Sequence, residues 1–170
     1  MVLWINPVIG AYSTQGLPDK QKTLIPSLHN FTYDTDFYVT NASITHALEF
    51  DVAMYTSGVG MFWGTQCVQG TDGYWDVLDK GGKDWVSTGV PCNYVDGWNH
   101  LTLEFQRVAG NKLLYKTITL NGVTADINVT YPAQAVPSNW YGITVNYQMD
   151  GDKTQDANTT YLDNLTLTYW

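Results

Sequence analysis

Two glutamates are the residues of this chain best suited to acid–base chemistry. Glu49 and Glu104 are its only glutamates, both fall at polar positions of alternating segments, and Asp51 follows Glu49 by two residues. Glycosidases use two carboxyl groups, about 5 to 5.5 Å apart in retaining enzymes and about 6.5 to 9.5 Å apart in inverting ones. Glu49 with Glu104 or Asp51 is therefore a candidate catalytic pair. The alternative is that Glu49 and Asp51 are surface groups that form ion pairs with Lys116 or Arg107.

Aromatic rings and side-chain amides form a second set of candidates, suited to binding. The chain contains seven Trp, twelve Tyr and five Phe. Such rings can cover the apolar face of a sugar, while amides bond to its hydroxyl groups. The candidate ligand-binding residues, which lie next to turn residues or on predicted strand faces, are Trp63, Gln66, Tyr74, Trp75, Trp85, Trp140, Asn146 and Gln148. Core positions are the alternative for some rings, and we expect Trp98 and either Trp75 or Trp85 to be buried.

Three aspartates in a short acidic segment are candidate metal ligands. Asp150, Asp152 and Asp156 offer oxygen ligands of the kind that Ca²⁺ prefers, although the spacing and terminal Glu of an EF-hand loop are missing. A structural calcium ion at the rim of a sheet is one interpretation, and a solvated acidic loop is the other. We expect no other cofactor.

The two cysteines bear on stability and compartment. Cys67 and Cys92 end two predicted strands, and we expect them to form a disulfide, with two buried free thiols as the alternative. A disulfide is typical of oxidising compartments. The segment that begins at Met1 lacks the basic and apolar regions of a signal peptide. We therefore expect a mature or excised domain of a secreted or cell-surface protein, extracellular or periplasmic, which could be part of a larger multidomain protein.

Composition excludes several classes of protein. Residues are 44% apolar and 14% charged, with a net charge of −8, which is typical of a folded chain. Arg107 is the only arginine, so the clustered cations that neutralise nucleic-acid phosphates are missing. No apolar run approaches the roughly 18 residues that a membrane-spanning helix needs.

Period-two alternation predicts an all-β chain. Apolar and polar residues alternate over 48–55, 101–106, 143–148 and 165–170, and short segments with Gly and Asn or Asp separate such runs. A length of 170 residues fits one domain. We predict a single antiparallel β-sandwich over residues 1–170, in which 1–30 form an irregular lead-in with one edge strand at most.

Three segments resemble a known group of folds. Asp96-Gly97-Trp98-Asn99-His100, the Glu-Phe-Asp strand within 47–52 and the Asp-Asn strand within 161–165 are similar to segments of laminin-G and concanavalin A-like domains. The resemblance covers residues 45–170 and implies a jelly roll. That fold hosts lectins, carbohydrate-binding modules, glucanases, lyases and adhesion domains, so it does not by itself define a function.

The chain departs from the enzymes of this group at two points. The glucanases carry a Glu-x-Asp-x-(x)-Glu strand, and here no third carboxylate follows Asp51. The lyases that act on uronates need basic residues, and this chain has one arginine. We therefore expect a non-catalytic domain that binds a poly- or oligosaccharide. The alternatives are a small glycoside hydrolase or polysaccharide lyase, and a structural or adhesion domain whose partner is a protein.

Overall fold

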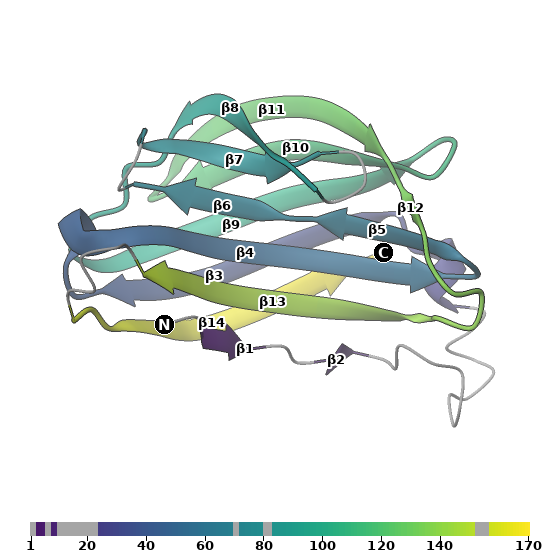
Figure 1. The fold of residues 1–170 in the computed structure, drawn as a ribbon, viewed down its shortest axis with the longest axis horizontal. Helices are drawn as coiled ribbons and strands as arrows, with labels where there is room; N and C mark the ends of the chain where they lie inside the picture. The colour runs from purple at the N-terminus through teal and green to yellow at the C-terminus, as the bar shows by residue number, and fades with distance from the viewer. Residues whose placement is uncertain (1–2, 6–7, 10–23, 70–71, 80–82, 152–156) are drawn as a thin grey trace.

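Two antiparallel β-sheets, packed face to face, make up the described part of the chain, and Figure 1 shows the first sheet in front of the second. The computed structural model describes residues 3–5, 8–9, 24–69, 72–79, 83–151 and 157–170. The prediction of an all-β antiparallel sandwich of the jelly-roll type is confirmed. The predicted lead-in contains two short strands, Leu3–Ile5 and Val8–Ile9, which is one more than expected, and both pair with the first sheet.

The first sheet positions the candidate site. Its main path, in spatial order, is β1 (Leu3–Ile5), β13 (Gly142–Gly151), β4 (Thr45–Thr56), β6 (Thr65–Val68), β7 (Tyr74–Leu78) and β8 (Trp85–Pro91). Off this path, β2 (Val8–Ile9) pairs with β13, β5 (Val59–Trp63) pairs with β4, and β12 (Gln134–Ala135) pairs with β5.

The second sheet has five strands. Their spatial order is β11 (Val123–Pro132), β10 (Lys112–Leu120), β9 (Gly97–Val108), β3 (Asn30–Val39) and β14 (Thr160–Tyr169). Two 3₁₀ turns, η1 (Ile25–Ser27) and η2 (Ala42–Ile44), flank β3. None of the helical segments in the described ranges is long and apolar enough to cross a bilayer.

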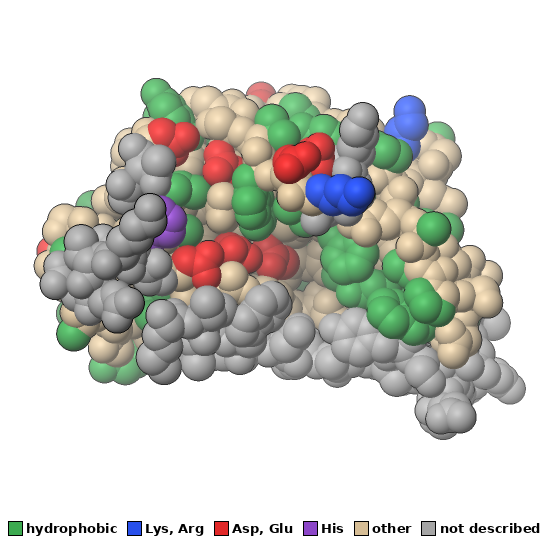
Figure 2. All heavy atoms as spheres, in the orientation of Figure 1, with side chains coloured by type: hydrophobic (Ala, Val, Ile, Leu, Met, Phe, Trp, Pro, Cys, Tyr) green, Lys and Arg blue, Asp and Glu red, His purple; other side chains and the backbone are tan. Residues whose placement is uncertain are grey.

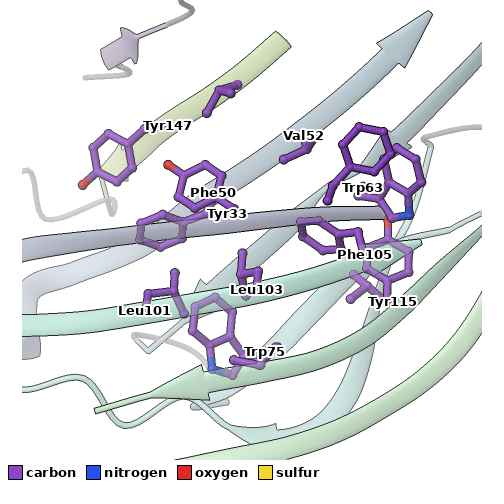
Figure 3. Close-up of a cluster of buried hydrophobic side chains, with 14 of the residues drawn as sticks. Tyr33, Phe50, Val52, Trp63, Trp75, Leu101, Leu103, Phe105, Tyr115 and Tyr147 are labelled. Atoms are coloured by element: carbon purple, nitrogen blue, oxygen red, sulfur yellow. The ribbon is translucent and has the colours of Figure 1, made fainter. Parts of the chain in front are cut away.

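The core lies between the sheets and is rich in aromatic rings (Figure 3). Trp63 of β5 packs against Phe31 of β3, with ring centroids 5.0 Å apart, and stacks on Phe105 of β9 at 6.1 Å. Burial alternates strictly along β3, as expected for a strand with one face on the core. The inward residues of each strand therefore form the core, and the outward residues are left for other roles.

Both edge strands of the second sheet are interrupted in the middle. Asn128 of β11 has φ 52° and Asn164 of β14 has φ 53°, which are left-handed conformations that asparagine tolerates better than most residues. The pairing register shifts beside each of them. Beside Asn128 the shift lies opposite Tyr115 and Thr117 of β10, and beside Asn164 it lies between Asp163 and Thr166. Each asparagine thus sits at a β-bulge on an edge.

The predicted disulfide is present. Cys67 of β6 bonds to Cys92, which directly follows β8, and their Cα atoms are 5.6 Å apart. The bond ties the segment after the edge strand β8 back to the interior of the sheet. The chain between the two cysteines, including strand β7, is thereby held in a closed loop of 25 residues.

Candidate functional site

The outward face of the first sheet carries a hollow lined by both apolar and polar side chains. Along β4, Leu48, Phe50 and Val52 point into the core, so Glu49 and Asp51 point outward. A pocket of about 340 Å³ opens on this face, and Glu49, Asp51, Asn146 and Thr144 contribute to its lining. Figure 2 shows acidic side chains gathered on this face of the molecule beside a hydrophobic group.

Amides and carboxyl groups alternate in a row across five strands. Successive cross-strand partners in this row are Gln148, Glu49, Gln66, Asp76 and Ser87. Gln148 Nε2 donates to Glu49 Oε1 at 3.0 Å, and Gln66 Nε2 donates to Asp76 Oδ2 at 3.0 Å. The row is therefore a hydrogen-bonded array fixed by strand register, because each member lies directly opposite the next.

A second, shorter row lies beside the first. Asn146 is the cross-strand partner of Asp51, and its Nδ2 donates to Asp51 Oδ2 at 2.8 Å. The other carboxylate oxygen of Asp51 accepts from the backbone amide of Thr65 at 3.1 Å. These two donors hold the Asp51 carboxylate in one orientation.

Two amide oxygens in the hollow have no hydrogen-bond partner among the described residues. Asn146 Oδ1 and Gln148 Oε1 are both buried, and their side chains are only 7% and 8% exposed. A buried polar atom without a partner costs free energy, and folded proteins contain few of them. Asn146 lines the pocket and Gln148 lies opposite Glu49 at its border, so Asn146 Oδ1 in particular is suited to accept a hydrogen bond from a ligand.

Burial and mutual repulsion raise the pKa values of the carboxyl groups. Burial, the charges of Asp51 and Asp150 and a hydrogen bond with Asp150 raise the pKa of Glu49 to about 8. Burial raises the pKa of Asp51 to about 6, although the hydrogen bonds from Asn146 and Thr65 lower it. Burial also raises the pKa of Asp76 above its ordinary value. At neutral pH Glu49 therefore holds a proton, and Asp51 is mostly ionised.

Aromatic rings line one end of the hollow. Tyr55 and Phe62 meet edge to face, with centroids 5.3 Å apart, and Trp140 packs on Tyr55 at 5.4 Å. Trp85 of β8 joins Tyr55 and Phe62 in the pocket lining and is 36% exposed. Rings beside a hydrogen-bonding array provide both an apolar and a polar surface to one ligand.

Comparison with known proteins identifies the fold. No family model matches the sequence, and no curated protein matches it. A tetrameric galectin from the ball sponge Cinachyrella sp. superposes with a TM-score of 0.50 at 11% identity, over 100% of this chain and 99% of that one. The alginate lyase Aly36B superposes with a TM-score of 0.54 at 16% identity, over 82% of this chain and 69% of that one. The chain has a concanavalin A-like fold.

Within this concanavalin A-like sandwich, several predicted residues share one face. Glu49, Asp51, Gln66, Asn146 and Gln148 lie in the two rows described above. Trp85 lines the same pocket, and Trp140 packs against Tyr55 at its margin. Tyr74 follows the alternation of β7, on the same face as Asp76, and is 39% exposed.

Three predictions about tryptophans are corrected. Trp63 and Trp75 are fully buried between the sheets, so neither indole can stack on a ligand at the surface. Trp98 was expected in the core, but it is 55% exposed and packs edge to face on Tyr38 on the outside of the second sheet. Burial of Trp75, the other half of that expectation, is confirmed.

The predicted partners of Glu49 are also corrected. Glu104 lies on the outward face of the second sheet, where Lys116 Nζ at 3.3 Å and Thr117 Oγ1 at 3.0 Å bond to it. A catalytic pair of Glu49 and Glu104 is therefore wrong, because the core separates them. Arg107 donates to Asn111 and to the Pro26 carbonyl instead of pairing with Glu49 or Asp51.

The calcium prediction stays untested. Asp152 and Asp156 lie outside the described residues, and Asp150 accepts a hydrogen bond from Gln148 at 2.9 Å. Within the described ranges, no three His, Cys, Asp or Glu side chains are grouped so as to hold a metal ion.

Sequence reasoning missed part of the site. Asp76, Ser87, Phe62 and Tyr55 were not among the candidates. The alternation of Tyr74, Asp76 and Leu78 around the buried Trp75 and Val77 is the signal that could have placed Asp76 on this face.

Proposed function

We propose that this chain binds a poly- or oligosaccharide on the outward face of its first sheet, without catalysis. The observation that carries the proposal is the buried, unpartnered amide oxygen of Asn146 in a hollow with aromatic rings, with a second such oxygen on Gln148, the cross-strand partner of Glu49. Sugar hydroxyl groups donate hydrogen bonds, and the C–H face of a sugar ring packs on aromatic side chains. The array and the exposed ring of Trp85, with Phe62 in the same pocket, match these two requirements.

A binding measurement with paired variants tests the proposal. Isothermal titration calorimetry is carried out with oligosaccharides of cellulose, xylan, mannan, β-1,3-glucan, galactan and chitin. Gln148→Met keeps the length of the side chain but removes its amide. The affinity for the recognised glycan should therefore fall about tenfold, which corresponds to about 1.4 kcal/mol of binding free energy. Gln106→Met makes the same change on the outside of the second sheet, and affinity should be unchanged.

Two results would contradict this assignment. If no glycan in the panel binds, a structural or adhesion role with a protein partner becomes the better hypothesis. If Gln106→Met and Gln148→Met weaken binding equally, the ligand does not occupy the hollow.

Hydrolysis is a second candidate, favoured by the different pKa values of two carboxyl groups on one strand. Glu49, with a pKa of about 8, holds the proton that a general acid needs, while Asp51, with a pKa of about 6, is mostly ionised. Ala53 occupies the next outward position, where the glucanase pattern would place a third carboxylate. Reducing-sugar release from the same glycans would establish this activity if the substitution Glu49→Gln abolishes it. Release that survives the substitution would exclude a catalytic role of Glu49.

The disulfide supports a location outside the cytoplasm. Cytosolic thiols are kept reduced, so a bond between Cys67 and Cys92 is typical of secreted or surface-exposed proteins. Together with a glycan ligand, it fits a protein that meets polysaccharide outside the cell. Detection of the oxidised form in the culture medium or periplasm of the native host would test this location.

A further inference from the structure

The side-chain amide donors of this face are largely occupied by its own carboxyl groups. Gln148 Nε2 donates to both Glu49 and Asp150, at 3.0 and 2.9 Å, which uses both of its protons. Asn146 Nδ2 donates to Asp51 at 2.8 Å, and Gln66 Nε2 donates to Asp76 at 3.0 Å.

The hydrogen-bonding groups that remain free on this face are mainly acceptors. Asn146 Oδ1 and Gln148 Oε1 are unpartnered and more than nine-tenths buried. The carboxylates of Asp51 and Asp76 have further lone pairs beyond the bonds they accept. A ligand that offers only acceptors, such as a carboxylate, finds few donors here.

The carboxyl groups of this face form no ion pair with a described side chain. Asp51 of β4, Asp150 of β13 and Asp76 of β7 lie on this face together with the protonated Glu49, and β6 separates β4 from β7. The side-chain ion pairs between described residues join His100 to Asp34 and Asp36, and Lys116 to Glu104, all on the second sheet. Burial and the charges of Asp51 and Asp150 raise the pKa of Glu49, and burial raises that of Asp51.

We propose that the glycan recognised in this hollow is an amino sugar polymer, whose protonated amino groups bind the carboxylates and the free amide oxygens. This inference rests on the proposed saccharide binding and specifies the ligand. An ammonium group has three donors and no acceptor, which complements a site that offers acceptors and negative charge. Uronate-containing glycans are excluded for the opposite reason, because their carboxylates would be repelled.

The aromatic end of the hollow fits the same ligand. Trp85, Tyr55 and Phe62 line the pocket that also contains Glu49 and Asp51. An indole or phenol face attracts a cation within about 6 Å and also packs on a sugar ring. The rings would thus bind the sugar ring while the carboxylates select its charge.

Four hexasaccharides that differ mainly in one substituent test this inference. Calorimetry with the whole chain at about pH 6.5, above the pKa of Asp51 and below that of an ordinary amine, compares β-1,4-linked glucosamine, N-acetylglucosamine, glucose and a uronate oligomer. The glucosamine hexamer should bind at least about tenfold more tightly than its N-acetylated form, and added salt should reduce the difference. The uronate oligomer should show no measurable binding.

Charge variants separate recognition from general attraction to an acidic protein. Asp51→Asn and Asp76→Asn should each reduce the preference for the glucosamine hexamer. Asp126→Asn removes the same charge from an exposed position of β11 in the second sheet and should leave the preference unchanged. A thermal unfolding curve for each variant shows whether it is folded. If a variant does not fold, the comparison of the four hexamers with the wild-type protein still tests the inference.

The possible outcomes distinguish this inference from the proposed function. Equal binding of the amino and N-acetylated hexamers would overturn the ligand assignment and leave saccharide binding intact. Failure of every hexamer and of the wider glycan panel would overturn both. If Asp126→Asn and Asp51→Asn reduce the preference for the glucosamine hexamer equally, the hexamer is attracted by the net charge of −8 and not by the hollow, and the assignment is overturned.

Discussion

The phenol oxygen of Tyr115, on the second sheet, accepts a 3.1 Å hydrogen bond from the backbone amide of Gly64, on the first. The same hydroxyl group lies 3.1 Å from the carbonyl oxygen of Phe62 and 3.0 Å from that of Leu78, to which it can donate. Gly64, Phe62 and Leu78 all line the candidate pocket. A fully buried side chain thus crosses the core and fixes the floor of the site from behind.

We predict that Tyr115→Phe destabilises the fold by about 1–3 kcal/mol, because it leaves the buried amide of Gly64 without its acceptor and one of the two carbonyls without its donor. Urea unfolding followed by tryptophan fluorescence measures the change. Tyr161→Phe removes a hydroxyl group from a residue that is 57% exposed, and its midpoint should match the wild type. Equal midpoints for Tyr115→Phe and the wild type would show that water satisfies these groups.

The positions of Trp63 and Trp98 predict opposite responses to truncation. Trp63→Ala should cost about 3–5 kcal/mol, because it removes a large ring from a packed core. Trp98→Ala should cost less than about 1 kcal/mol, because a side chain that is 55% exposed loses little packing. Guanidinium unfolding of both variants, followed by circular dichroism, measures the two losses of unfolding free energy. A larger loss for Trp98→Ala than for Trp63→Ala would contradict the burial of Trp63 and the exposure of Trp98.

Stability should fall as pH rises, because the folded state raises the pKa of Glu49. This pKa lies at about 8 in the folded protein against 4.5 in a model compound, so the folded protein holds a proton that the unfolded chain releases. The stability contributed by this group is fully present below pH 4.5 and is lost as pH increases to about 8. Asp51 acts in the same direction up to about pH 6.

Glu49→Gln should therefore flatten the pH profile. Between pH 6 and 8 the wild type should lose up to about 1.4 kcal/mol per pH unit, and the variant should lose much less. Urea midpoints at three pH values measure the slope. Glu104→Gln, on the other sheet, serves as the matched control and should keep the wild-type slope. A wild-type profile that is level over this range would contradict the burial of the Glu49 carboxyl group.

Loss of the disulfide should lower stability. The bond closes a loop of 25 residues, for which the loop-entropy model gives about 3 kcal/mol. Cys67→Ser/Cys92→Ser, or wild-type protein in reductant, should unfold at a lower denaturant concentration by a comparable free energy. Reductant should have no further effect on the double variant. An unchanged midpoint on reduction would mean that the unfolded chain is already compact around these residues.

Alternation explains how much of this structure the sequence could predict. In β4 the apolar residues 48, 50 and 52 placed Glu49 and Asp51 on the outward face, because the side-chain period of a strand is two. Applied to β9, the same rule makes Leu101, Leu103 and Asn99 inward and Trp98 outward, as observed. The prediction for Trp98 was wrong because this residue alternates with the inward-facing Asn99 and therefore points outward.

Strand neighbours could not be predicted in the same way. Gln148 and Glu49 are 99 residues apart in the chain and become partners only through the pairing of β13 with β4. Glu104 has the same local pattern as Glu49 but belongs to the other sheet. Local periodicity shows which way a residue faces, whereas the folded topology decides which residues it meets.

The bulges at Asn128 and Asn164 have a consequence for the molecule in concentrated solution. A straight border strand offers a row of free amides and carbonyls onto which another copy could add a strand of its own. At both borders of the five-stranded sheet, a left-handed asparagine breaks that row in its middle. A second molecule would meet two short, twisted halves instead of a continuous template, so these asparagines protect the protein from aggregation through its sheet edges.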